Sequence, residues 1–327
     1  MATLAIIGAG LTGLTAAHQL GECAKVTLFD KSRGTSGRMA TRRAAPYAFD
    51  HGAQFFKIRS DAFGAFVDPM IRDGVVGRWD ARFVEVEDTR IVKRRQWGAE
   101  FPHYVGMPGM NAMGKYLAQG LDVRLGTRIQ SMQQTDNRWA LYDEQGALQG
   151  LYDWVVSTVP AQQAAELLPA SLPFYSTVSA IHLQSCFSLM LGFEHPIDMA
   201  FDAALVRERD ISWISVNSSK PGRNSAFSLL VHSSNQWADQ HLEDNRDDVM
   251  EYLCRQTSEV IGCDVRQAGH RALHGWRFAN IERQSGPTHF LCAAQRVGVS
   301  GDWLIQGRVE AAFKSGSDLA EALKREL

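Results

Sequence analysis

Apolar runs alternate with glycine-rich turns and amphipathic stretches near the N-terminus. Residues 3–7 form a continuous apolar run that stops at glycines, a pattern typical of a buried parallel strand. A helical periodicity covers residues 12–20, with Gly21 as a plausible C-cap. A second β-branched and aromatic run, residues 25–29, ends at Asp30. The chain therefore begins with a predicted βαβ unit.

The middle of the chain reads as a series of strands. Three stretches, at 128–133, 139–142 and 152–159, are separated by turn-rich pieces and predict a meander. Residues 178–193 form a long run too rich in Ser, Cys and Phe for a helix. Strands are predicted at 211–216 and 225–232.

The turn between those two strands is marked by residues 220–223, Lys-Pro-Gly-Arg. Apolar residues at helical spacing predict an amphipathic helix at 246–261. The C-terminal segment returns to a predicted strand at 302–305 and a predicted helix at 307–323. The overall pattern indicates an α/β protein with a second, mainly antiparallel part.

Composition and charge argue against binding to nucleic acid or to a membrane. The 34 basic and 36 acidic residues give a net charge of −2, which provides no overall field for nucleic acid or an anionic membrane. No apolar run approaches the ~18–20 residues that span a bilayer, and no secretory signal is recognisable, so we expect a soluble, cytoplasmic protein. Five cysteines without a C-x-x-C pair fit buried thiols in a reducing compartment.

Two common kinds of catalytic centre have no support in the sequence. Only one pair among the ten histidines, His270 and His274, has the H-x-x-x-H spacing, and no histidine pairs with a carboxylate in a known ligand pattern, so no metal site is predicted. No G-x-S-x-G motif is present, which leaves a hydrolytic triad without support. We therefore expect a bound cofactor to carry the chemistry, with no catalytic side chain of the protein.

The strongest motif follows the first strand and opens the first helix. Gly8, Gly10 and Gly13 have the G-x-G-x-x-G spacing, and Asp30 closes the next strand. The glycines allow a tight turn, close approach to a diphosphate and close helix–strand packing, while the helix N-terminus meets the phosphate charge. Asp30 is placed to accept hydrogen bonds from a ribose. The motif predicts dinucleotide binding without distinguishing NAD from FAD.

Basic residues follow this motif directly. They suit a second phosphate-binding arm, although a solvated charged loop is the alternative; they are Lys31, Arg33, Arg38, Arg42 and Arg43. At the other end of the chain, the helix starting near Gly307 could direct its positive end toward a flavin ring.

Further motifs give the chain its resemblance to a family. Gly37-Arg38 follows the acid, then the segment Asp50-His51-Gly52-Ala53-Gln54-Phe55-Phe56, and Gly301-Asp302 precedes the last helix. With these motifs the sequence resembles the flavin-dependent amine oxidase superfamily and, within it, the renalases. The resemblance runs over the full length, with its specific motifs at the two ends.

The resemblance implies non-covalent FAD and a set of residues that hold it. In such proteins the Gly-Arg pair contacts the diphosphate, the aspartate of the Gly-Asp pair binds ribitol or phosphate, and a meander residue near Ile129 meets adenine through its backbone. The implied cofactor-binding residues are Gly8, Gly10, Leu11, Thr12, Gly13, Asp30, Lys31, Gly37, Arg38, Met39, Gly52, Ala53, Gln54, Phe55, Ile129, Thr158, Pro160, Gly301, Asp302 and Val309.

The resemblance also implies the reaction. Renalases oxidise 2- or 6-dihydro isomers of NAD(P)H to NAD(P)⁺ by hydride transfer to flavin N5, with O2 reduced to H2O2. Such a substrate becomes an aromatic pyridinium on losing hydride, so no general base is required. The alternatives are a flavin-dependent amine oxidase and a non-catalytic nucleotide-binding regulatory protein.

A dinucleotide substrate needs cationic and amide contacts of its own. Lys57 and Arg59 follow the Asp50–Phe56 segment, and a basic run at 93–95 leads to an amide and an indole. The candidate substrate-binding residues are Lys57, Arg59, Gln96, Trp97, His232 and Asn280. Trp276, Phe278 and Trp303 are candidates for aromatic residues beside the flavin, or for core aromatics.

These observations predict two domains built from separate stretches. A Rossmann-type FAD-binding domain would comprise residues 1–60, 103–163 and 287–327. An inserted antiparallel-sheet substrate domain would comprise residues 61–102 and 164–286.

Overall fold

A computed structural model describes all 327 residues, which divide into two compact units. The first unit comprises Met1–Arg38, Gly114–Leu183 and Ile281–Leu327, and the second comprises Met39–Met113 and Gln184–Asn280. Relative to the boundaries expected from the sequence, residues 39–60 and 103–113 thus belong to the second unit, and residues 164–183 and 281–286 belong to the first.

The residues just after position 39 join the second unit because of a short hairpin. Strand β3 (Thr41–Ala44) pairs with β4 (Tyr47–Asp50). The β4 side chains Tyr47 and Phe49 pack with Met190 and Leu230 of that unit, so burial of these apolar side chains fixes where the hairpin lies.

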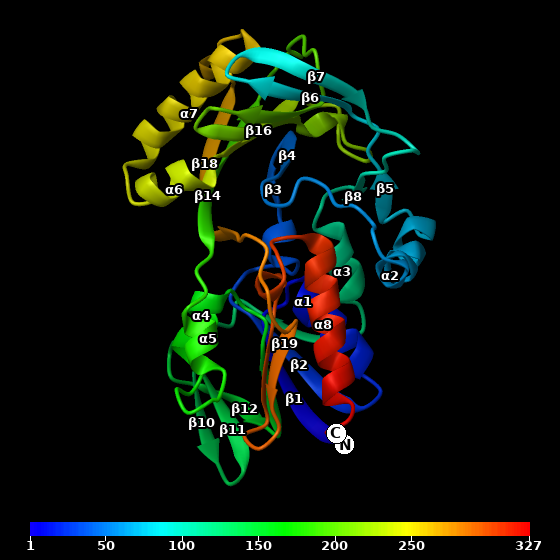
Figure 1. The fold of residues 1–327 in the computed structure, drawn as a ribbon, viewed down its shortest axis with the longest axis vertical. Helices are drawn as coiled ribbons and strands as arrows, with labels where there is room; N and C mark the ends of the chain where they lie inside the picture. The colour runs from blue at the N-terminus through cyan, green and yellow to red at the C-terminus, as the bar shows by residue number, and fades with distance from the viewer. The chain divides into compact units, whose positions relative to one another are not determined.

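A six-stranded sheet forms the centre of the first unit (Figure 1). Its order is β19-β20-β13-β1-β2-β9, and all neighbouring strands are parallel except the edge pair β19 and β20, which is antiparallel. The strands are β1 (Ala2–Ile7), β2 (Ala24–Asp30), β9 (Asp122–Leu125), β13 (Trp154–Ser157), β19 (His289–Cys292) and β20 (Val297–Ser300). Leu4, Ala5 and Ile6 are fully buried, as expected of a central parallel strand.

Two long helices lie side by side in this unit, α1 (Leu11–Leu20) and α8 (Val309–Leu323) (Figure 1). A Cβ added at Gly316 of α8 would lie 2.5 Å from the carbonyl oxygen of Thr12. Only glycine at this position lets the two backbones approach so closely. Both helices match their predicted positions within two residues.

The predicted meander is present as an antiparallel sheet of β10 (Ile129–Thr135), β11 (Arg138–Asp143) and β12 (Leu148–Tyr152). The prediction of one continuous strand over residues 152–159 was wrong. Tyr152 ends β12, whereas β13 belongs to the parallel sheet. Asp153 separates them: its carboxylate accepts hydrogen bonds from the backbone N–H and the hydroxyl of Thr3, both at 2.8 Å.

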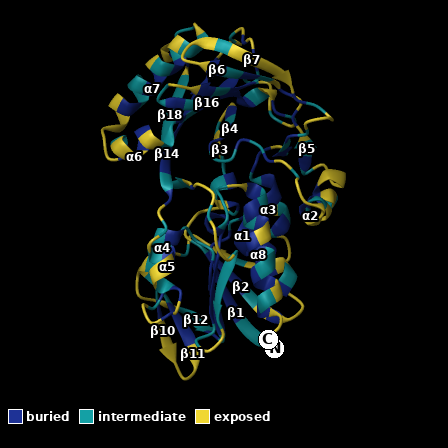
Figure 2. Cartoon of the chain, in the orientation of Figure 1, coloured by how far each residue is buried: buried dark blue, intermediate teal, exposed yellow.

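A seven-stranded sheet dominates the second unit, in the order β18-β14-β17-β16-β15-β6-β7. All neighbours are antiparallel except β15 and β6, which run parallel. The strands are β6 (Arg82–Glu87), β7 (Arg90–Gln96), β14 (Gln184–Gly192), β15 (Ala203–Arg207), β16 (Ile211–Val216), β17 (Ser228–Ser233) and β18 (His270–Asn280). The edge strand β7 is exposed over most of its length, and its basic side chains discourage edge-to-edge pairing (Figure 2).

The two faces of this sheet differ in chemistry. One face, with Phe187, Leu189 and Val231, forms an apolar core with α6 (Asn235–His241) and α7 (Arg246–Ile261). Helix α7 has the predicted bounds, begins at the side-chain cap of Asn245 and ends at Gly262 with φ +70°. Because side chains alternate along strands, the register places His232, His274 and Trp276 on the opposite face.

The predicted strand at 302–305 was wrong. After β20 ends at Ser300, the chain forms the 3-10 helix η4 (Asp302–Leu304), in which the Leu304 N–H donates to the Gly301 carbonyl. Trp303 is buried and its indole N–H donates to the Val159 carbonyl at 3.0 Å. The apolar residues Trp303 and Leu304, which suggested a strand, are instead buried in this 3-10 helix.

The remaining elements are short. They are η1 (Gly37–Met39), α2 (Asp61–Arg72), β5 (Val76–Arg78), β8 (Tyr104–Gly106), α3 (Ala112–Leu117), α4 (Ala161–Leu167), α5 (Tyr175–Ser179), η2 (Asn217–Ser219) and η3 (Val265–Gln267). None of the helices combines the length and apolar character needed to cross a bilayer. All five cysteines are unpaired.

Candidate functional site

The carboxyl edge of the parallel sheet gathers residues that lie far apart in the sequence. Strands β1, β2, β13 and β20 run parallel, so their C-terminal ends lie along one edge. Gly8 follows β1, Asp30 ends β2, Thr158 follows β13 and Gly301 follows β20. In open α/β sheets this edge is where nucleotides bind.

The three glycines of the motif have different roles in the structure. Gly8 has φ +114°, and a Cβ there would lie 2.7 Å from Thr158 Oγ1. A Cβ at Gly13 would lie 2.1 Å from the Gly8 carbonyl oxygen. A Cβ at Gly10 would meet nothing within 4 Å. Gly8 and Gly13 are thus required by packing, while Gly10 borders open space that fits an approaching diphosphate.

The start of α1 is chemically suited to that diphosphate. No side chain caps the helix, whose first residues are Leu11 and Thr12. The first N–H groups of a helix have no partner within it and carry partial positive charge. An anion at this position would supply the missing acceptor.

Asp30 is held in place and retains hydrogen-bonding capacity. One carboxylate oxygen accepts the Ala9 N–H and the other accepts the Ser32 N–H, both at 2.8 Å. Each oxygen keeps a further lone pair that can accept a ribose hydroxyl. Lys31 follows Asp30 on the surface, and partial desolvation together with the nearby cation Arg128 lowers its pKa.

The Gly-Arg and Gly-Asp pairs meet in the structure. Gly37 has φ +51°, and a Cβ there would lie 3.4 Å from the Gly10 Cα. Arg38 forms an ion pair with Asp302 across 264 residues of sequence. The ion pair holds both side chains beside the glycine turn.

The other expected cofactor residues of the first unit lie along the same edge. The Thr127 N–H donates to the Asp30 carbonyl at 2.9 Å, which brings the start of β10 at Ile129 close to Asp30. The Thr158 N–H donates to the Ile7 carbonyl, and Pro160 precedes α4. Val309 begins α8, whose N-terminus also lacks a side-chain cap.

Five expected cofactor residues belong to the second unit: Met39, Gly52, Ala53, Gln54 and Phe55. The Gln54 amide is fully used within this unit. Its N–H groups donate to the carbonyls of Asp50 and Gly52, at 2.5 and 2.9 Å, and its oxygen accepts from Ser215 and Lys220. Any contact of Gln54 with a cofactor would therefore come from its backbone.

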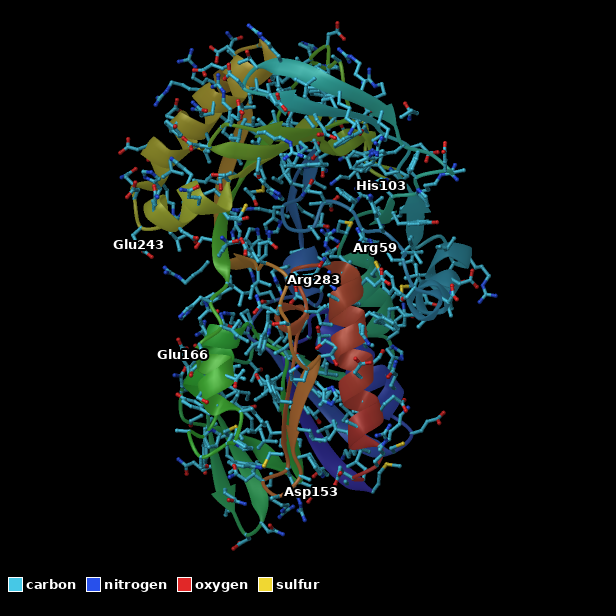
Figure 3. The ribbon with its side chains drawn as sticks, in the orientation of Figure 1. Arg59, His103, Asp153, Glu166, Glu243 and Arg283 are labelled. Atoms are coloured by element: carbon cyan, nitrogen blue, oxygen red, sulfur yellow. The ribbon has the colours of Figure 1, made fainter.

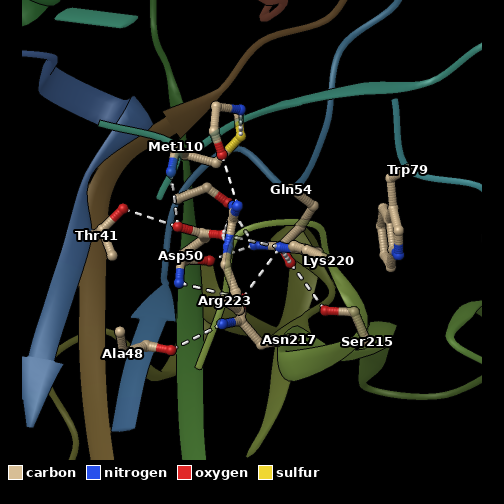
Figure 4. A network of polar contacts seen from close by, with 12 residues as sticks. Thr41, Ala48, Asp50, Gln54, Trp79, Met110, Ser215, Asn217, Lys220 and Arg223 are labelled. Carbon is tan, nitrogen blue, oxygen red and sulfur yellow. Dashed lines mark hydrogen bonds and ion pairs between the residues drawn. The ribbon is translucent and has the colours of Figure 1, made fainter. Parts of the chain in front are cut away.

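A buried network of charges surrounds Gln54 (Figure 4). Asp50 accepts from Lys220 at 3.3 Å and from Arg223 at 2.5 Å, and its second oxygen accepts from Thr41 and from the Met110 N–H. The side chains of Asp50 and Lys220 are fully buried, and that of Arg223 is 2% exposed. We call Asp50, Lys220 and Arg223 the buried triad.

Burial and neighbouring charges shift the pKa values of the triad. Burial lowers the pKa of Lys220 to about 8, against the opposing effect of Asp50. Burial by itself would raise the pKa of Asp50, but Lys220 and Arg223 outweigh it and the pKa is lowered. The sequence marked residues 220–223 only as a turn. The available signal was two cationic residues flanking Pro-Gly, four residues after the end of the buried strand β16 at Val216.

A second cluster, the histidine face, comprises His51, His232, His274 and Trp276. The His51 ring stacks on Trp276 with centroids 5.2 Å apart and meets His274 edge-on at 5.0 Å. The His51 carbonyl accepts hydrogen bonds from Ser188 and from the Trp276 indole. Nδ1 of His51 and Nε2 of His232 are buried without a hydrogen-bond partner. The fold itself supplies neither nitrogen with a hydrogen-bond partner.

The histidine face is uncharged at neutral pH. Burial lowers the pKa of His51 and of His232 to about 4, and it also lowers the pKa of His274. The nearby cation Arg42 contributes to the lowered pKa of His51 and His274. Arg42 makes no ion pair of its own. Only His232 of this cluster was among the substrate residues expected from sequence.

The other expected substrate residues have varied surroundings. Lys57 and Arg59 are exposed in the segment before α2. Figure 3 labels Arg59. The Gln96 amide donates to the Asp80 and Trp97 carbonyls. Trp97 is buried and stacks on His103, a packing role. Asn280, exposed at the end of β18, donates to Asn235 at 3.4 Å.

Comparisons with known proteins define the class. Residues 6–69 match the NAD(P)-binding Rossmann-like domain, and residues 80–324 match the flavin containing amine oxidoreductase family. The second match covers most of the chain, which therefore belongs to the flavin containing amine oxidoreductase family. Its cofactor is FAD, which the cradle at Gly8–Gly13, Asp30 and Arg38 fits.

Solved structures share the whole fold at low identity. A putative protoporphyrinogen oxidase from Exiguobacterium sp. 255-15 gives a TM-score of 0.81 at 11% identity, covering 100% of this chain and 99% of that one. A putrescine oxidase triple mutant gives 0.73 at 11% identity with the same coverage. Wild-type putrescine oxidase bound to putrescine gives 0.69 at 11% identity, covering 98% of each chain. The chain is thus a flavin-dependent oxidoreductase of the amine oxidase fold.

Proposed function

We propose that this flavoprotein oxidises 2- or 6-dihydro isomers of NAD(P)H to NAD(P)⁺, with O2 as the final acceptor and H2O2 as the product. FAD, when bound, supplies the chemistry by accepting a hydride at flavin N5 and passing two electrons to oxygen. The protein's own contribution is to bind and orient the substrate ring, which is neutral until it loses hydride.

The observation that carries the proposal is the uncharged histidine face beside an unpaired arginine. An alkylamine is a cation in water, and neither neutral imidazoles nor Arg42 would attract it. A dihydronicotinamide is a neutral planar ring, suited to stacking on imidazole and indole. Its carboxamide could bond the unpartnered nitrogens of His51 and His232, and Arg42 suits its diphosphate.

The proposed reaction also agrees with the ionisable groups present. A dihydronicotinamide that loses hydride becomes a pyridinium, so no proton has to be removed. The buried carboxylate Asp50 and the buried amine Lys220 are already engaged with each other and with Arg223. Neither is required as a general base, and the chain supplies binding and orientation.

The decisive experiment is anaerobic stopped-flow reduction of the flavin by a panel of donors. We expect rapid bleaching by 2- or 6-dihydronicotinamide dinucleotides and slow bleaching by the ordinary 4-dihydro isomer. Bleaching by an amine alone would establish an amine oxidase instead. Flavin that no donor reduces would indicate a non-catalytic nucleotide-binding protein.

A further inference from the structure

We propose that the buried triad holds His51 in one orientation, in which its ring offers Nδ1 to the ligand of the histidine face. The ligand itself, the carboxamide of a dihydronicotinamide, rests on the proposed function. The attachment of His51 rests only on contacts within the second unit. Lys220 and Arg223 are positioning residues, because both side chains are buried and act on His51 through Asp50.

The residue before His51 is held through its side chain and its backbone. The Asp50 carboxylate accepts hydrogen bonds from Lys220 at 3.3 Å and from Arg223 at 2.5 Å. The Asp50 N–H donates to the Asn217 side chain at 3.3 Å. Asp50 is thus fixed from two directions, and the peptide unit that leads into His51 cannot rotate without breaking these contacts.

The residue after His51 is held through Gln54 (Figure 4). The Gln54 amide nitrogen donates to the carbonyls of Asp50 and Gly52, at 2.5 and 2.9 Å, which lie on either side of His51. Lys220 donates to the Gln54 oxygen at 3.1 Å. Because an ammonium only donates, it fixes which end of the amide faces it and so directs the amide N–H groups to the two carbonyls.

His51 itself completes the arrangement. Its carbonyl accepts hydrogen bonds from the Ser188 hydroxyl at 2.6 Å and from the Trp276 indole at 2.8 Å. The ring stacks on Trp276 and meets His274 edge-on. Nδ1 is buried and has no hydrogen-bond partner, in a residue whose backbone and ring are otherwise held on several sides. A fixed ring with one unused nitrogen is suited to orienting a ligand.

Stability alone does not explain three buried charges at this place. Apolar side chains of similar volume avoid the cost of desolvation, and replacing buried ion pairs with them is often neutral or stabilising. Charge-assisted hydrogen bonds are short and directional, which apolar contacts are not. The three acceptors of Lys220 are Asp50, Gln54 and Asn217. Each of them also bonds the backbone at or beside residues 50–52, so the triad's contacts converge on His51.

A double-mutant cycle between Lys220 and His51 tests the proposal on the FAD-loaded protein. The measured quantity is the second-order rate constant for flavin reduction by a 2- or 6-dihydronicotinamide dinucleotide without oxygen, alongside FAD content by absorbance. His51→Ala and Lys220→Met should each lower this constant about tenfold, as expected for one lost hydrogen bond. The double variant should lose no more than His51→Ala alone, because Lys220 acts through His51.

A second readout does not depend on the substrate. In protein labelled with ¹⁵N-histidine, the imidazole NMR signals that His51→Ala removes belong to His51. These signals should be single and sharp in the wild type, and broadened or split in Lys220→Met as the ring samples several orientations. Tyr252→Phe is the matched control. It removes a hydrogen bond to Asp210 on the apolar-core side of the sheet and should leave the His51 signals unchanged.

A second variant covers the case in which Lys220→Met does not fold. Gln54→Met keeps all three charges of the triad and removes the amide that bonds the carbonyls on either side of His51. It should give the same loss of rate, the same dependence on His51 and the same change in the His51 signals.

Two results would overturn the proposal. Equal losses from Lys220→Met in the wild-type and His51→Ala backgrounds would show that the triad acts independently of His51. Unchanged His51 signals in a folded Lys220→Met protein would show that the ring keeps its orientation without the triad. A protein whose flavin no dihydronicotinamide reduces, but whose His51 signals change in Lys220→Met, would refute the proposed substrate and support the positioning role.

Discussion

Three histidines of this protein are held in their neutral form by the fold. His51, His103 and His232 lie in the second unit, and burial lowers the pKa of each to about 4. An ordinary unfolded histidine has a pKa near 6.5. The folded state therefore keeps these imidazoles neutral in a range where the unfolded chain binds protons.

This difference predicts acid destabilisation. Between about pH 6.5 and pH 4 the unfolded state binds more protons than the folded state, so stability falls as the pH is lowered through this window. The loss should be on the order of 2 kcal/mol per histidine, measured as the free energy of urea unfolding at pH 7.5 and pH 4.5. His103→Gln should flatten the pH dependence, whereas His195→Gln, at an exposed position, should not. Equal slopes in all three proteins would contradict this account.

Arg42 gives a second prediction at this scale. Arg42 and Arg43 are neighbours on β3, so their side chains point to opposite sides of the strand, and of the two only Arg42 contributes to the lowered pKa of His51 and His274. If Arg42 binds the substrate's diphosphate, Arg42→Met should raise KM about tenfold or more with kcat nearly unchanged. Arg43→Met is the matched control and should leave both constants near wild type. A lowered kcat with unchanged KM would place Arg42 in another role.

In the turn between β1 and α1, one glycine is required for packing and another is available for ligand binding. Gly13 is closed in by the Gly8 carbonyl and Thr158, while Gly10 faces open space. Gly10 has φ −75°, a value that any residue adopts. A side chain at Gly10 therefore costs the fold little and occupies the position expected for the diphosphate.

We predict opposite outcomes for two alanine substitutions. Gly10→Ala should fold with a Tm of the FAD-free protein close to wild type, yet lose FAD. Gly13→Ala should lower the Tm of the FAD-free protein, because its Cβ cannot be accommodated without moving the backbone. Thermal melting and the flavin absorbance of each purified protein provide the measurements. A Gly10→Ala protein that retains full FAD would show that the diphosphate does not approach this glycine.

At the scale of the whole molecule, FAD binding should couple to stability because the cradle draws on three separate stretches of the first unit. A ligand that binds only the folded state stabilises it by about 2.7 kcal/mol at a hundredfold excess over Kd. Adding FAD to the cofactor-free protein should therefore raise its Tm in a concentration-dependent way. Asp30→Ala should weaken this rise by removing the ribose acceptor, and a full rise in that variant would refute the role of Asp30.

Local patterns in the sequence determined the cradle and several elements. The glycine turn, the apolar strand before it and the acid after it all lie within about thirty residues. Backbone sterics and helix-end electrostatics act over that range, so they can be read from neighbouring residues. The helix at 246–261 was equally predictable, because its periodicity and its Asn245 cap are local.

The tertiary structure alone decided the buried triad and the histidine face. Asp50 and Lys220 meet across 170 residues of sequence, and His51 meets Trp276 across 225. Which strands pair, and in which register, depends on burial summed over the whole sheet, and no local pattern records it. The turn at 220–223 was therefore visible in the sequence, whereas the direction of its two cationic side chains into the interior was not.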